Sequence, residues 1–119
     1  MNSRPEQLRD RTKAFALRVI RLFRSLPNKT DTQVLGKQLL RCGTSVAANY
    51  RAVCRARSKA EFVARLGIVA EEADEAVLWL ELLIESGILK SVLTEGLLNE
   101  ARELAAILTA SREMARKAA

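Results

Sequence analysis

Residues 58–87 read SKAEFVARLGIVAEEADEAVLWLELLIESG, and the spacing of apolar residues within this stretch decides the fold. Ser58 and Glu61 match a capping box, which starts a helix by satisfying free backbone N–H groups. Gly87 suits the left-handed backbone conformation that ends a helix. The apolar residues between them follow the 4-3 spacing of a left-handed bundle: Phe62, Leu66, Val69, Ala73, Ala76, Leu80 and Leu83. We therefore expect a helix over residues 59–86 that packs against other helices along this seam.

Three other segments show the same kind of periodicity, and none shows the alternation of a strand. The first begins at Pro5 and ends before Pro27, and the last repeats apolar residues at heptad spacing. Short connections separate the segments, which favours neighbouring helices that run in opposite directions. The sequence predicts one all-α domain over residues 1–119, an antiparallel up-down-up-down four-helix bundle. Its helices are expected at about residues 5–26, 31–57, 59–86 and 92–116.

The composition argues against an enzyme. The chain of 119 residues has no histidine, so it has no imidazole base, no catalytic triad and no histidine metal ligand. The Glu-x-x-His pairs that hold metals in bundles are absent, as are glycine-rich phosphate loops. Cys42 and Cys54 are interpreted as free thiols of a reducing compartment, with a disulfide as the alternative. We expect no catalytic residue, metal, cofactor or small-molecule substrate.

Neither a membrane span nor a secretion signal is apparent. No run approaches the roughly 20 apolar residues that a bilayer requires. Residues 1–6 lack the apolar centre of a signal peptide. A cytoplasmic location without membrane contact is therefore expected.

Charge is distributed unevenly along the chain, whose net charge is +6. Residues 1–26 hold seven Lys/Arg against two Asp/Glu, and residues 27–57 hold six against one. Residues 58–86 reverse the balance with two against seven, and residues 87–119 hold five against four. Two interpretations are open: the helices pair their charges internally, or the basic half meets an anionic partner.

Basic residues follow one face of each of the first two predicted helices. Binding a phosphate backbone requires aligned arginine and lysine with no fixed sequence, so these faces are candidate nucleic-acid contacts. The candidates are Arg11, Arg18, Arg21, Arg24, Lys37, Arg41, Arg51 and Arg55. The alternative is a solvated face that the acidic segment partly neutralises.

The second and third helices have features that a simple monomeric bundle does not need. Gln38, Ser45 and Asn49 lie on the inner stripe of the second helix and need hydrogen-bond partners there. We interpret them as a polar network that sets helix register. Residues 77–84, which include Trp79, are apolar almost all round the helix. A helix of this kind requires more than one neighbour, so we expect self-association.

Several motifs together resemble one protein family. They are Leu40 to Tyr50 (LRCGTSVAANY), Arg55 to Phe62 (RARSKAEF), Glu72 to Glu75 (EADE) and Trp79 to Leu83 (WLELL). In this order they resemble the bacterial 23S rRNA intervening-sequence protein family, over nearly the whole chain. The resemblance implies a four-helix bundle that assembles as a homopentamer and whose biochemical role is poorly defined. The family is also similar to the accessory variability determinant of diversity-generating retroelements, a basic pentamer that binds nucleic acid.

The sequence thus predicts a nonenzymatic accessory protein that binds RNA or DNA and associates with itself. The alternative is a structural or protein-interaction scaffold whose basic faces pair with the acidic faces of neighbouring subunits. An enzyme remains only if the core holds an unexpected cofactor.

Overall fold

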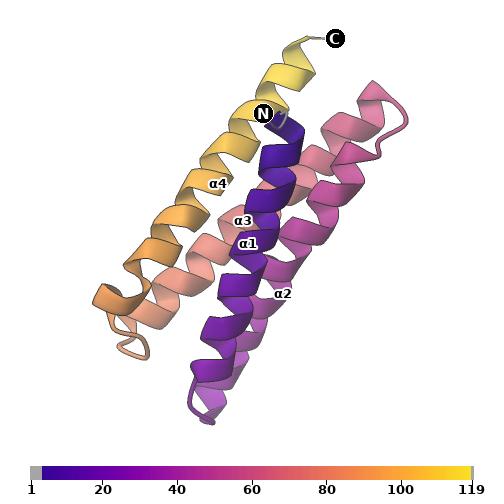
Figure 1. The fold of residues 1–119 in the computed structure, drawn as a ribbon. Coiled ribbons are helices and arrows are strands. Elements are labelled where there is room, and N and C mark those ends of the chain that lie inside the picture. Colours follow the sequence, from indigo (N-terminus) through magenta and orange to yellow (C-terminus); the bar gives the residue numbers. More distant parts are fainter. Residues whose placement is uncertain (1–3, 119) are drawn as a thin grey trace.

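The computed structural model describes residues 4–118 and contains four α-helices (Figure 1). They are α1 (Arg4–Ser25), α2 (Thr30–Cys54), α3 (Lys59–Glu85) and α4 (Ser91–Lys117). No strand occurs among residues 4–118, which confirms the all-helical class. The backbone spans 47 × 27 × 19 Å, so its longest dimension is close to the length of one 27-residue helix, about 40 Å.

The helices form a bundle in which α3 lies between α2 and α4 and packs against both along its length. α1 packs mainly against α2 and meets α4 over a smaller area, and Figure 1 shows α1 and α4 on the same side of the bundle. The third helix is therefore the central element, as its seam in the sequence predicts.

The predicted seam of α3 is the inner surface of the bundle. Its buried members are Leu66, Val69, Ala73, Ala76, Leu80 and Leu83. Phe62, predicted as the first residue of the seam, is instead 37% exposed. It lies in the first turn of α3, at the end of the bundle, where it lines a shallow recess with Leu8 and Tyr50. The last layer of the core is open on this side.

The other helices complete the core with residues at helical spacing. Their largest buried side chains are Phe15 and Val19 of α1, Leu39, Val46 and Tyr50 of α2, and Leu97, Leu104 and Leu108 of α4. Burial of each leucine or phenylalanine stabilises the fold by roughly 1.5–3 kcal/mol. The hydrophobic effect is therefore a major contribution to the stability of the bundle. Cys42 is buried and Cys54 is exposed, and both are free thiols, as interpreted from the sequence.

The connection between α2 and α3 differs from the sequence prediction. α2 ends at Cys54, whereas the sequence predicted a helix as far as Arg57. Ser58 has an extended backbone, and its hydroxyl accepts a hydrogen bond from the Glu61 N–H at 3.1 Å. The predicted cap is thus confirmed. The Glu61 carboxylate reaches back to the N–H of Arg57, so the chain must leave the α2 helix before this residue.

Gly87 ends α3 as predicted, because its φ of +86° lies in the left-handed region. The Gly87 N–H donates to the Ile84 carbonyl, and the Leu89 N–H donates to the Leu83 carbonyl at 2.9 Å. These bonds satisfy carbonyl groups of the last turn. None of the described helices combines the length and apolarity that crossing a bilayer requires.

Gly43 and Gly96 provide a matched test of helix packing. A Cβ atom at Gly43 would lie 2.9 Å from both methyl carbons of buried Val19, whereas a Cβ at Gly96 would meet only the Arg18 guanidinium, at 3.5 Å. We expect Gly43→Ala to lower the free energy of unfolding, because overpacking costs about 1–3 kcal/mol and exceeds the gain in helix propensity. Gly96→Ala should raise it by up to about 1 kcal/mol.

Urea unfolding followed by circular dichroism measures both changes. A Gly43→Ala protein as stable as Gly96→Ala would contradict the close approach of α1 to α2.

Candidate nucleic-acid interface

Arg11 lies where α1 faces α4, and its charge is compensated within the chain. Its Nε and Nη2 atoms donate to both carboxylate oxygens of Glu100 at 2.8 and 2.7 Å, and Nη2 lies 3.3 Å from Glu103. The hydrogen bond to Glu100 raises the pKa of Arg11 above its usual range. A two-pronged contact of this kind fixes geometry as well as charge. Arg11 therefore connects two helices, although the sequence predicted a phosphate contact.

Arg41 has a similar place between α2 and α3. Its guanidinium lies 3.4 Å from Glu72 and 3.3 Å from Glu75, and it donates to the Cys42 sulfur at 3.2 Å. The Cys42 sulfur and the two carboxylates lie within 4.8 Å of one another, which is close enough for a metal site. The Arg41 guanidinium already supplies the positive charge that a metal cation would bring to these groups.

The remaining predicted cations are exposed, and none forms an ion pair with another described residue. They are Arg18, Arg21 and Arg24 of α1, Lys37 and Arg51 of α2, and Arg55 just beyond α2. Within the described chain, the acidic residues that face the basic helices are therefore matched to Arg11 and Arg41 alone. The others leave an uncompensated basic surface on α1 and α2.

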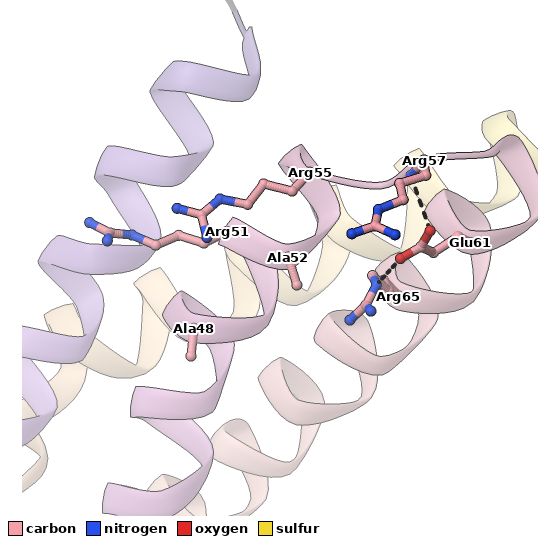
Figure 2. Close-up of a pocket in the computed structure, with 7 residues that line it drawn as sticks. All are labelled: Ala48, Arg51, Ala52, Arg55, Arg57, Glu61 and Arg65. Atoms are coloured by element: carbon pink, nitrogen blue, oxygen red, sulfur yellow. Dashed lines mark hydrogen bonds and ion pairs between the residues drawn. The ribbon is translucent and has the colours of Figure 1, made fainter.

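The end of α2 and the start of α3 enclose a groove, which we call the α2–α3 groove (Figure 2). Its floor contains the small side chains of Ala48 and Ala52. Its other lining residues are the four arginines Arg51, Arg55, Arg57 and Arg65, together with Glu61. Only one acidic residue thus stands among four cations.

Glu61 is held by internal contacts within this groove. Its carboxylate accepts from the Arg57 backbone N–H at 3.1 Å and from the Arg65 Nε at 2.9 Å (Figure 2). The Arg57 N–H, followed by Arg65, lowers the pKa of Glu61. Glu61 therefore stays ionised at neutral pH, and its charge is offset by Arg65.

A second groove, the α1–α2 groove, lies on the other side of Arg51 and Arg55. These two arginines line it together with Arg9, Asp10, Lys13 and Cys54. Arg9 lies 3.8 Å from Asp10. Arg51 and Arg55 thus form a wall that the two basic grooves share.

Sequence reasoning named Arg51 and Arg55 as candidate contacts but did not include Arg57 and Arg65. Arg57 was expected as the last residue of the second helix, whereas α2 ends at Cys54 and Arg57 lies in the connection that lines the groove. Arg65 is one of two basic residues in the acidic segment 58–86, so it was not considered as a phosphate contact. Only the path of the α2–α3 connection brings these residues to Arg51 and Arg55.

Within the described part of one chain, hydrogen bonds do not connect the three side chains of the predicted polar network. Gln38, Ser45 and Asn49 are half-buried on α2. The Gln38 carbonyl oxygen accepts from the Arg41 Nε at 3.3 Å, and no hydrogen bond links the three side chains within residues 4–118. A role of these residues between copies of the chain remains a prediction.

α3 also carries apolar side chains on its outer side. Ile68, Leu78 and Leu82 are 48%, 47% and 39% exposed. Their spacing places them on one face of the helix. Glu71 and Asp74 are exposed on the same helix and form no ion pair within the described residues. This outer face is the structural counterpart of the apolar stretch that predicted self-association.

The comparisons with known proteins agree on one family. The model of the 23S rRNA-intervening sequence protein family matches residues 6–110. A solved structure from Bacteroides thetaiotaomicron VPI-5482, described as a protein with unknown function from the S23 ribosomal protein family, superposes with a TM-score of 0.85. The two sequences are 33% identical, and the similarity covers 93% of this chain and 99% of the other. None of the curated proteins matches this chain.

The two thiols should differ sharply in reactivity. Burial raises the pKa of Cys42 to about 11, against an opposing effect of Arg41, and Cys42 has no exposed surface. Because the thiolate is the nucleophile, iodoacetamide at pH 8 should alkylate Cys54 and leave Cys42 unmodified. Peptide mass spectrometry locates the label.

In denaturant both thiols should react, and Cys54→Ser should leave the folded protein without a reactive thiol. Alkylation of both cysteines at similar rates in the folded protein would show that Cys42 is accessible.

Proposed function

Because this chain belongs to the 23S rRNA-intervening sequence protein family, we propose that it is a nonenzymatic accessory protein that binds RNA or DNA. One observation carries the proposal: Arg11 and Arg41 are compensated by carboxylates of α4 and α3, whereas the other candidate cations form no ion pair with a described residue. A surface of this kind attracts an anionic polymer.

The physical basis is the release of counterions. Each phosphate that an arginine or lysine neutralises frees condensed cations, and this entropy gain requires no particular base sequence. The exposed cations Arg18, Arg21 and Arg24 on α1, with Arg51 and Arg55 on α2 and just beyond it, supply such contacts. Affinity should then depend strongly on salt and weakly on sequence.

The nonenzymatic part of the proposal depends on the lack of suitable groups. The sequence contains no histidine. The cluster of Cys42, Glu72 and Glu75 is occupied by Arg41, and burial raises the pKa of the thiol. A protonated thiol beside two paired carboxylates is a poor nucleophile and a poor base.

We also propose that successive helices run antiparallel, that copies of the chain assemble as a homopentamer, and that the protein is cytoplasmic. The short connections between the helices in Figure 1 support the first point. The exposed Ile68, Leu78 and Leu82 of α3 support self-association, because a contact with another copy would bury them.

A scaffold without nucleic-acid binding is the second candidate. Glu71 and Asp74 on the outer face of α3 favour it, because they have no basic partner within the described chain. In an oligomer, these acids would meet the basic face of a neighbouring copy and neutralise it. The two candidates differ in whether the outer arginines remain available after assembly.

Reversing charge on the basic face tests the function. The protein with Arg18→Glu, Arg21→Glu, Arg51→Glu and Arg55→Glu should lose binding to a ribosomal RNA fragment and to DNA at 50 mM salt, as measured by fluorescence anisotropy. The matched control changes Lys29, Lys59, Lys90 and Lys117 to Glu, which alters net charge equally outside this face. It should retain most of the binding.

Circular dichroism should show the same helicity for all three proteins. If the wild type binds neither RNA nor DNA at low salt, the nucleic-acid function is wrong and the scaffold function is favoured.

Changing the outer face of α3 tests self-association. Leu78→Lys with Leu82→Lys should convert the oligomer to a monomer in light scattering, because burying unpaired lysine charges in an apolar contact costs more free energy than the contact gains. Helicity should be unchanged, since both side chains are partly exposed. Met114→Lys, at an exposed site on α4, is the control and should leave the oligomer intact. A wild-type chain that is monomeric at all concentrations would contradict assembly.

A further inference from the structure

We infer that the wall formed by Arg51 and Arg55, with the α1–α2 and α2–α3 grooves on either side, is the centre of phosphate contact for a double-helical nucleic acid. This inference depends on the proposed function and assigns it to one end of the bundle. It also adds Arg9, Lys13, Arg57 and Arg65, which were not among the candidate nucleic-acid contacts of the sequence.

The arrangement of the wall supports a shared site. Arg51 and Arg55 are four residues apart, one turn along the helix, and both line both grooves. In Figure 2 their side chains extend toward α1, while Arg57 and Arg65 lie on the α3 side. One ligand can therefore meet cations from three helices and a connection within a single region.

The floor and the single acid of the α2–α3 groove also favour an anionic polymer. Ala48 and Ala52 leave space for a backbone to approach α2. Glu61 would repel phosphate if its charge were free, but Arg65 and the Arg57 N–H already engage both of its oxygens. The side chain of Arg57 makes no ion pair within the described residues, so it is available to a ligand.

The lack of aromatic residues in both grooves decides between nucleic-acid forms. Proteins that hold single strands combine basic grooves with aromatic side chains on which the bases stack. Among residues 4–118, no aromatic residue lines either groove, and the lining residues are alanine, cysteine or charged. A double helix keeps its bases stacked inside and presents phosphates and sugars along its outer surface, which match such a surface.

The first experiment compares two variants with equal loss of charge. Arg51→Gln with Arg55→Gln should weaken binding of a 20-base-pair DNA duplex by roughly tenfold or more. The same change should reduce the slope of log affinity against log salt concentration by about 1.8. Lys90→Gln with Lys117→Gln, at exposed sites on α4 or beside it, should leave both quantities close to wild type. Equal effects of the two variants would overturn the assignment.

The second experiment uses Cys54 as a native reporter, because it lines the α1–α2 groove and is exposed. Saturating duplex should slow its alkylation by iodoacetamide, a neutral reagent, severalfold. An unchanged rate at saturation would place the ligand elsewhere. A 20-nucleotide single strand without secondary structure should bind more weakly than the duplex, and tighter binding would refute the preference for a double helix.

These outcomes separate the inference from the function on which it depends. If the wild type binds duplex but the arginine pair and Cys54 are indifferent to it, the site is wrong and the function stands. If the wild type binds no nucleic acid at low salt, both are wrong.

Discussion

Burial of the α3 seam on two sides is the constraint on which the rest of the structure depends. Leu80 and Leu83 have no exposed surface, because α2 and α4 both pack against the helix that carries them. α1 then packs mainly against α2 and makes a limited contact with α4. The four helices therefore differ from one another in how many of their faces are covered by other helices. These differences decide which charged residues form ion pairs within the chain.

The charges follow from this packing order. Arg41 lies where α2 faces the acidic α3, and Arg11 lies where α1 faces Glu100 and Glu103 of α4, so each meets two carboxylates. The other candidate cations meet no acid among the described residues, and these include Arg18, whose guanidinium lies beside Gly96 of α4. Exposed ion pairs contribute little to stability, so the outer arginines cost the fold little when they remain unpaired. The imbalance between the basic first half and the acidic third segment is thus only partly cancelled by folding.

The sequence predicted the parts of this structure that depend on periodicity. Four helices, the α3 seam, the Ser58 cap and the Gly87 end are all local patterns that tertiary packing preserves. The candidate site was harder to predict from the sequence, because a helical wheel assigns residues to the faces of one helix but does not say which faces of different helices meet. Arg11 and Arg41 were therefore expected on open surface and are paired instead. The end of α2 was missed because no glycine or proline marks it.

The contact of Gly43 with Val19 has a consequence for how the molecule fluctuates. It brings the backbones of α1 and α2 close together, so this hairpin should move as one rigid body. The boundary between α1 and α4 is smaller, and transient opening is expected to begin there. Because the rows of unpaired guanidinium groups lie on the rigid hairpin, their spacing persists through such breathing. An anionic partner would meet a preorganised surface and would spend little conformational entropy on ordering it.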